Sequence, residues 1–250
     1  MFGNPTFRHS PEYKDFLFDG TITLCIGRDK KRMEIHKKLL TSISPELDKH
    51  VNNDMKEGIE GVIHLPDEGE EAIALFTKWA YTGDYTAWDS ALFGIAQHQW
   101  PSLHKHLQLC AFSDKFNIPV LKQLAELKFY TQIITLEPKS KEDGAGLILA
   151  ISYAHNNLRS SDPVLKFLTQ YASWKFELLR ETPGFRELIM AQPEFLTELL
   201  ATLKGSSTKP IAPEPQKRPK KKNNSNIFGT GQPPKPQPPP PLFGSWPSQF

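Results

Sequence analysis

The chain has 250 residues, of which 38% are hydrophobic and 23% charged, and its formal net charge at pH 7 is +2. This composition suits one globular domain with additional chain, and it excludes a collagen-like protein, a membrane helix bundle and a disulfide framework. No apolar run approaches the ~20 residues of a membrane span, and the first ten residues contain no apolar signal core. The two cysteines, Cys25 and Cys110, lie far apart in apolar surroundings. They are interpreted as reduced packing residues of an intracellular protein.

Alternating hydrophobicity predicts three short strands near the start of the chain. Residues 21–26 form the first strand, and its predicted inward face is Ile22, Leu24 and Ile26. Turn-forming residues at 27–30 and renewed alternation behind them predict a hairpin. A helical stretch then begins near His36, and Ser44 before Pro45 is typical of a helix N-cap. Residues 62–65 predict the third strand.

Helical spacing dominates the chain after the third strand. Asp67 and Glu70 have the spacing of a capping box before a helix whose apolar face is predicted to be Ala72, Phe76, Trp79 and Ala80. A polar and aromatic loop is expected over residues 84–101, followed by a helix over 103–116. A further long helix is predicted to bury Val120, Leu124, Leu127 and Ile134.

Only helices are expected beyond Pro138. Each of three helices is predicted to start where a proline follows Asp162, Thr182 or Gln192, and the first is expected to continue through Leu179. Three strands interleaved with helices and then helices alone indicate an α+β fold, with a small three-stranded sheet covered by helices.

The last part of the chain has a different composition. Residues 205–250 hold 12 of the 22 prolines and seven basic residues against one acidic residue, a net charge of +6, whereas residues 1–204 carry −4. Such a segment cannot bury enough apolar surface to offset its chain entropy. We therefore expect a disordered Pro/Lys-rich tail over 205–250, and also a flexible N-terminus over residues 1–15.

Three sequence blocks together resemble the BTB (POZ) domain, in the form found in filamentous fungi. The first runs from Phe18 to Pro45 and contains the motif residues His36, Leu39, Leu40 and Ser44. The second runs from Lys56 to Gly83 and ends in Tyr81-Thr82-Gly83, and the third is Leu109–Leu121. The blocks occur in the family's order and cover residues 16–136. Residues 137–204 resemble the helical extension that such proteins carry.

The resemblance implies a protein interaction module without catalytic residues or cofactors. BTB domains form dimers with themselves or with another BTB protein, through a pocket in which an Asp before the first strand meets a basic residue after the motif His. Asp19 and Lys37 are the matching positions. Many members also dock on a cullin as substrate adaptors of a ubiquitin ligase. Residues 84–108 contain no Glu, so the cullin-contact signature is not evident. A nuclear scaffold or regulator is therefore favoured, and the cullin adaptor is the alternative.

A function of another class depends on one short segment. His98, His104, His106 and Cys110 form the one cluster with metal-like composition, so a small metal-binding protein or enzyme is a further alternative. His106 and Cys110 share a helix face, whereas His104 and His106 point to different sides. We therefore expect no metal here, and an ordinary helix start. The aromatic residues Phe76, Trp79 and Tyr81 are interpreted as core, and with the acidic globule this argues against specific nucleic-acid binding.

The tail contains two short motifs. Lys217, Arg218, Lys220, Lys221 and Lys222 resemble a nuclear import signal. Lys235, Pro238 and Pro241 have the spacing of a polyproline ligand for SH3-like domains, although a stiff spacer fits equally well. These motifs predict a nuclear location, with the cytoplasm as the alternative, and no association with membranes.

Overall fold

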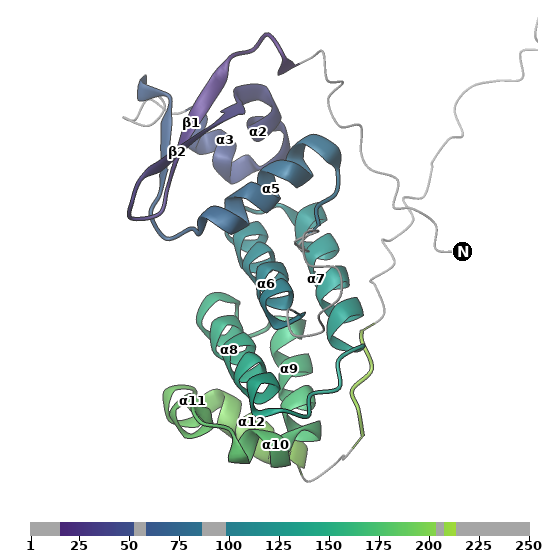
Figure 1. Cartoon of the computed structure of the whole chain (residues 1–250). Coiled ribbons are helices and arrows are strands. Elements are labelled where there is room, and N and C mark those ends of the chain that lie inside the picture. Colours follow the sequence, from purple (N-terminus) through teal and green to yellow (C-terminus); the bar gives the residue numbers. More distant parts are fainter. Residues whose placement is uncertain (1–15, 53–58, 87–98, 204–207, 214–250) are drawn as a thin grey trace, which may run out of the picture. The chain divides into compact units, whose positions relative to one another are not determined.

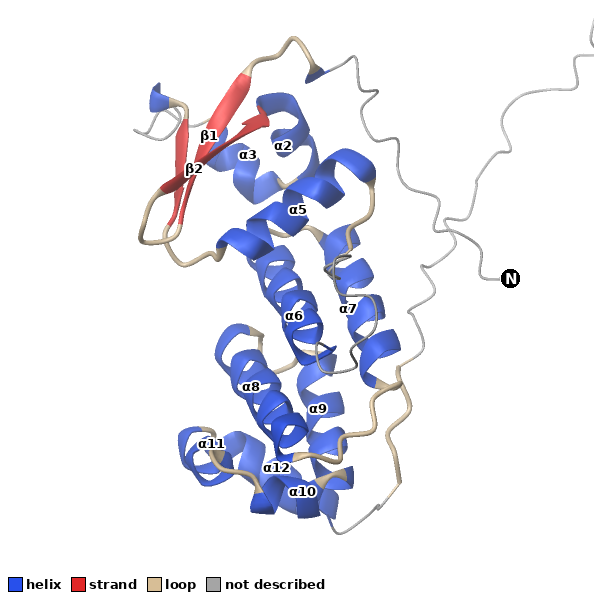
Figure 2. Cartoon of the chain, viewed as in Figure 1, coloured by secondary structure: helices blue, strands red, loops and turns tan. Residues whose placement is uncertain are grey.

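A computed structural model describes residues 16–52, 59–86, 99–203 and 208–213. Within these ranges, ten helices and a small three-stranded sheet form a mixed α+β fold, as the sequence predicts (Figure 1). The strands are β1 (Thr21–Ile26), β2 (Lys31–His36) and β3 (Val62–Leu65). Every described strand precedes residue 66, and the structure beyond it is helical (Figure 2).

The sheet has the order β2-β1-β3. The predicted hairpin is confirmed, because β1 pairs antiparallel with β2 and places Thr21 opposite His36. β3 pairs parallel with β1, with Leu24 opposite Ile63. The predicted inward face is also confirmed, since Ile22, Leu24 and Ile26 are buried, whereas Thr21 is exposed. One face of the sheet therefore joins the core.

Two short helices connect β2 to β3. They are α2 (Lys37–Ile43) and α3 (Pro45–Val51), and both pack against the sheet (Figure 2). Ser44 caps α3 as predicted, because its side chain accepts a hydrogen bond from the Leu47 N–H at 3.0 Å. Helix α5 (Glu70–Thr82) buries Ala72, Phe76 and Trp79 as expected. The predicted capping box at Asp67 and Glu70 is wrong, because Gly69 is the N-cap of α5.

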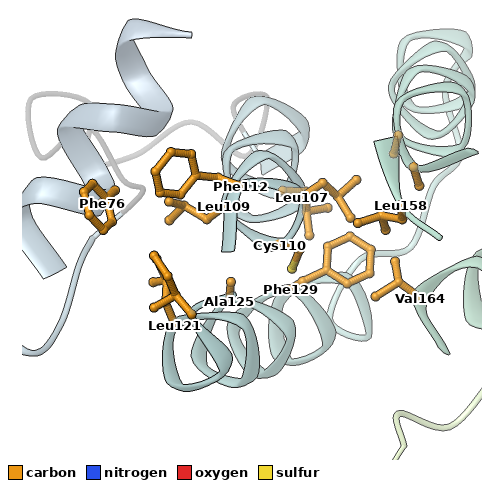
Figure 3. Close-up of a cluster of buried hydrophobic side chains, with 14 of the residues drawn as sticks. Phe76, Leu107, Leu109, Cys110, Phe112, Leu121, Ala125, Phe129, Leu158 and Val164 are labelled. Carbon is orange, nitrogen blue, oxygen red and sulfur yellow. The ribbon is translucent and has the colours of Figure 1, made fainter. Parts of the chain in front are cut away.

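Two long antiparallel helices, α6 (Gln99–Lys115) and α7 (Pro119–Ile133), follow. Helix α6 begins four residues before its predicted start, since Pro101 is tolerated in a first helical turn, where no N–H partner is required. The predicted inward face of α7 is only partly right: Val120, Leu124 and Ile134 pack half-buried against the core, whereas Leu127 is 48% exposed. The side chains that contact α6 lie on a neighbouring stripe, which comprises Leu121, Ala125, Phe129 and Ile133 (Figure 3). Because α7 is apolar on several sides, only its packing partners decide which stripe is buried.

Five further helices complete the described fold: α8 (Lys141–Asn157), α9 (Pro163–Trp174), α10 (Phe176–Glu181), α11 (Phe185–Ala191) and α12 (Pro193–Leu203). Asp162 caps α9 and α12 begins at Pro193, as predicted. The helix expected to run through Leu179 is interrupted at Lys175, which separates α9 from α10. The helix expected at Thr182 begins instead at Phe185, after Gly184 in the left-handed conformation (φ +90°).

One continuous core joins these helices to the preceding ones. Helix α8 packs on α6 and on α9. The buried Tyr171 hydroxyl on α9 donates to the carbonyl oxygens of Ile133 (3.3 Å) and Leu136 (3.1 Å) at the end of α7. Residues 137–203 are therefore packed against the end of α7 and against α6.

Within the part of the chain that the structure describes, no helix combines the length and apolar character that a membrane span requires.

Candidate interaction site

A histidine and a tyrosine from distant parts of the sequence close the end of the sheet. His36 ends β2, and Tyr81 lies near the end of α5. The Tyr81 hydroxyl accepts a hydrogen bond from the backbone N–H of His36 at 3.1 Å and lies 2.7 Å from its ring Nδ1. Phe16 packs on both rings, with centroid distances of 5.4 Å and 6.1 Å. This geometry gives the two motif residues a structural role at the end of the sheet.

The remaining motif residues also position the backbone. Leu39 and Leu40 are buried in α2. The buried Ser44 hydroxyl donates to the carbonyl oxygen of Phe116 at 2.6 Å, which ties the start of α3 to the end of α6. Gly83 ends α5 in the left-handed conformation, with φ of +76°, where a side chain would be strained. These motif residues therefore maintain the fold and are not themselves a binding surface.

Asp19 and Lys37 lie near the Thr21–His36 pair, which is the first pair of the β1–β2 ladder. The Lys37 N–H donates to the Gly20 carbonyl oxygen at 3.1 Å, so the two candidate pocket residues lie at one end of the sheet. Asp19 is exposed and Lys37 half-buried, and among the described residues no ion pair joins them. Their charges are thus available to a partner at the same end of the sheet.

An exposed aromatic residue, Phe18, precedes Asp19 in the chain, and no sequence pattern identified it as a site residue. Residues 16–19 form a turn, closed by a hydrogen bond from the Asp19 N–H to the Phe16 carbonyl oxygen at 3.2 Å. We call it the strand-entry turn. Phe18 on this turn is 94% exposed and Leu17 is 39% exposed. An aromatic residue so exposed beside an acidic and a basic side chain has the composition of an interface core with a charged rim.

The candidate metal segment does not gather its histidines in one place. His98 lies outside the described residues. The His104 ring packs on Tyr153 at 4.6 Å, whereas the His106 Nδ1 lies 2.8 Å from the Tyr85 hydroxyl. Burial raises the pKa of the Cys110 thiol well above its usual range, so the thiol is neutral at pH 7. Among the described residues, no three His, Cys, Asp or Glu side chains are placed to hold a metal ion.

A network of ion pairs that the sequence analysis missed joins α7 to the start of α9. Lys122 Nζ lies 2.7 Å from Asp162 Oδ2 and 2.9 Å from Asp114 Oδ1, and Asp114 also pairs with Arg159 Nε at 2.8 Å. The Asp162 side chain is only 1% exposed. Although burial opposes it, hydrogen bonding to Asp162 and Asp114 raises the pKa of Lys122. These groups pair with one another across α6, α7 and the start of α9, so the network secures the packing of these helices.

Both tail motifs lie outside the described residues. The import-like residues Lys217–Lys222 and the polyproline ligand at Lys235–Pro241 therefore remain predictions from the sequence.

Comparison with known proteins adds no family assignment. No protein-family model matches the chain, and a search of curated proteins found no significant match.

Proposed function

We propose that this chain is a BTB-type interaction protein that self-associates and recruits a second partner, acting as a nuclear scaffold or regulator. The observation that carries the proposal is the element order β1-β2-α2-α3-β3-α5-α6-α7 around a β2-β1-β3 sheet. The motif residues that carry the sequence resemblance occupy structural positions within this order. His36 and Tyr81 bond to one another, and Ser44 joins α3 to α6. Agreement between local motifs and tertiary positions supports the resemblance.

The strand-entry turn supplies a surface for self-association. A symmetric dimer uses the same patch on both copies, so an acidic residue and a basic residue in one patch can pair across the axis. Asp19 and Lys37 meet this condition, and Phe18 offers an apolar anchor between copies. Burying one phenylalanine side chain contributes about 2 kcal/mol. A charge pair at such a patch adds specificity of pairing more than affinity.

The helices after residue 140 supply a surface for a second partner. Large apolar side chains are exposed on three of them, namely Leu149 on α8, Met190 on α11 and Leu200 on α12. They lie outside the strand-entry turn, so a second partner contacting them does not use the proposed dimer patch. Helix α11 contacts both α8 and α12, and an apolar patch shared by these neighbouring helices would fit recruitment of another protein.

Sedimentation equilibrium of the full chain tests self-association. We expect a dimer at micromolar concentration. Asp19→Lys and Lys37→Asp should each weaken it at least about tenfold, equivalent to about 1.4 kcal/mol. The double charge reversal should restore dimerisation, because the pair is re-formed with opposite polarity. Phe18→Asp should also weaken the dimer.

Matched variants separate this surface from a general effect of charge. Lys38→Asp changes the neighbouring exposed residue of α2, and Leu149→Asp changes an exposed apolar residue on α8. Both should dimerise like the unmodified chain. A monomeric unmodified chain, or single charge reversals that leave the dimer intact, would contradict the proposed surface.

Affinity capture from native extract distinguishes the scaffold from the cullin adaptor. We expect the full chain to retain nuclear partners and no cullin. Retention of a cullin would overturn the scaffold assignment and favour the ubiquitin-ligase adaptor. The Phe18→Asp chain, captured in parallel, shows whether any retained partner requires the strand-entry turn.

A further inference from the structure

We propose that the surface around Trp174, at the end of α9, is a binding site for Lys-Pro-x-x-Pro segments, and that residues 235–239 of the chain's own tail are its second occupant. The first occupant is visible in the structure. Residues 208–213, which we call the strap, lie against this surface after α12 has ended. Figure 1 shows the strap beside the segment that joins α7 to α8.

An aromatic residue holds the basic residue of the strap. Lys209 Nζ lies 5.1 Å from the centroid of the Trp174 ring, within the range of a cation–π contact. Lys175 Nζ lies 3.9 Å from the same ring. The Tyr171 ring meets the indole edge-on at 5.2 Å and supports it from α9. Trp174 therefore presents a preformed aromatic surface that accepts a cation.

Some side chains of the strap are half-buried and others are exposed. Lys209, Pro210 and Ala212 are half-buried, whereas Ile211 is 89% exposed and Pro213 is also exposed. No backbone hydrogen bond joins residues 209–213 to the other described residues. Proline-rich segments in the polyproline II conformation bind aromatic surfaces in this way, because their backbone forms no internal hydrogen bonds. Recognition thus depends on a few side chains, and another segment with the same pattern can make the same contacts.

The charges around the site favour exchange of the strap. Burial lowers the pKa of Lys175, and the cations Lys139 and Lys209 lower it further, whereas Glu137 and Asp143 act in the opposite direction. Glu137 and Asp143 thus attract a lysine at this surface. Lys175 repels that same lysine. A segment held by a few side-chain contacts, one of them opposed by a like charge, is displaced at little cost.

The tail repeats the pattern of the strap. The strap reads Lys209-Pro210-Ile211-Ala212-Pro213, and the tail reads Lys235-Pro236-Gln237-Pro238-Pro239. These two segments contain the only Lys-Pro dipeptides of the 250-residue sequence. The outward position carries Ile in the strap and Gln in the tail, as expected where a side chain contacts solvent. The inward position carries Ala in one and Pro in the other, both small and apolar.

Fluorine NMR of the full chain tests the site directly. The chain contains five tryptophans, so incorporation of 5-fluorotryptophan gives few signals, and Trp174→Phe identifies the signal of Trp174. The probe is a synthetic peptide with the sequence of residues 232–241, and the control peptide carries Glu in place of Lys235. In the chain that carries both Lys209→Glu and Lys235→Glu, which weakens the strap and the chain's own tail segment as occupants, we expect the first peptide to shift the Trp174 signal with saturation. The control peptide should not.

Competition by the strap gives a second readout. The unmodified chain should require at least about five times more peptide than the doubly substituted chain for half saturation, because the strap and the tail segment occupy the site. Lys166→Glu, at an exposed position of α9, should behave like the unmodified chain. The proposal would be overturned if millimolar peptide left the Trp174 signal of the doubly substituted chain unmoved, or if both peptides moved it equally. If Trp174→Phe unfolds the chain, the Trp174 signal is assigned by substituting the other four tryptophans instead. Binding at Trp174 does not require self-association. A negative result for the Trp174 site therefore does not contradict the proposed dimer surface, and the reverse also holds.

Discussion

The hydroxyl of Tyr81 is one of the few side-chain groups that connect the sheet to the helices after β3. It bonds to both the backbone and the ring of His36, which is half-buried where β2 ends and α2 begins. His36 is the N-cap residue of α2, but its side chain makes no capping hydrogen bond because its ring faces Tyr81. Tyr81 thereby fixes the path of the chain at the strand–helix junction.

Replacing Tyr81 by Phe should destabilise the protein by about 1–2 kcal/mol, because a partly buried N–H and a ring nitrogen lose their partner. Urea unfolding measures the change. Tyr130→Phe is the matched control, since the buried Tyr130 hydroxyl has no hydrogen-bond partner among the described residues. That variant should be neutral or slightly more stable. Equal losses from the two variants would contradict the assigned role of Tyr81.

A buried histidine makes stability depend on pH. Burial lowers the pKa of His106 to about 4, the nearby Lys128 cation lowers it too, and a hydrogen bond with Gln132 acts in the opposite direction. In the unfolded chain His106 is protonated below about pH 6.5, whereas in the folded chain it is protonated only below about pH 4. The contribution of neutral His106 to the free energy of unfolding is fully present above pH 6.5 and is lost as the pH falls towards 4.

Unfolding measured by urea between pH 7 and pH 4 tests this linkage. A shift of this size corresponds to about 3 kcal/mol at the acid end. His106→Gln should flatten the curve in part, because burial also lowers the pKa of His104 and His155. His64→Gln, at an exposed position of β3, should keep the curve of the unmodified chain. An unchanged slope in His106→Gln would refute the prediction.

Helix α8 packs closely on its neighbours at two glycines, of which Gly146 faces α6. A Cβ atom on Gly146 would fall within the indole of Trp100, and one on Gly144 would overlap Thr182. The Trp100 Nε1–H donates to Asp143 Oδ1 at 3.1 Å, and Asp143 forms a capping box with Ser140 at the start of α8. The ring, the cap and the glycine together determine how closely the two helices approach.

Gly146→Ala should destabilise the protein by about 1–3 kcal/mol, even though alanine favours a helix, because the added methyl displaces the indole. Chemical denaturation followed by circular dichroism measures the loss. Gly69→Ala provides the comparison, since the N-cap glycine of α5 has open space around a Cβ atom. Its stability should fall by only about 0.5–1 kcal/mol, because alanine is a poorer N-cap than glycine but meets no neighbouring atom. A Gly146→Ala chain as stable as the unmodified one would show that α6 and α8 are not held by this contact.

Charge is distributed unevenly along the chain as a whole. Residues 1–204 are net acidic and the remainder is net basic. The five cations between Lys217 and Lys222 are concentrated in six residues, which suits an extended ligand for an acidic groove. In the proposed function, this segment directs a scaffold to the nucleus.

Changing Lys220, Lys221 and Lys222 together to Ala should move a fluorescently tagged full chain from the nucleus to the cytoplasm, because three of the five clustered cations are removed. Fluorescence microscopy measures the nuclear-to-cytoplasmic ratio, which we expect to fall several-fold. Lys235→Ala removes another cation of the tail outside the cluster and should leave the ratio unchanged. An unaltered location of the triple variant would refute the import signal.

Local periodicity determined most elements of this protein from the sequence alone. Alternation placed β1 and its inward residues, and a hydroxyl or carboxylate before a proline located the caps Ser44 and Asp162. These signals act between residues a few positions apart, so they operate without knowledge of the fold. Asp19 and Lys37, in contrast, were proposed as a pair only because of the resemblance to the BTB family.

Only the tertiary structure decided the features that depend on contacts between distant residues. It selected the buried stripe of α7, joined Lys122 to Asp162 and brought Trp174 to Lys209. It also left Phe18 exposed on the strand-entry turn, a placement that no sequence pattern predicted. The physical reason is that burial is a property of packed surfaces: an apolar residue is interior only when another element covers it.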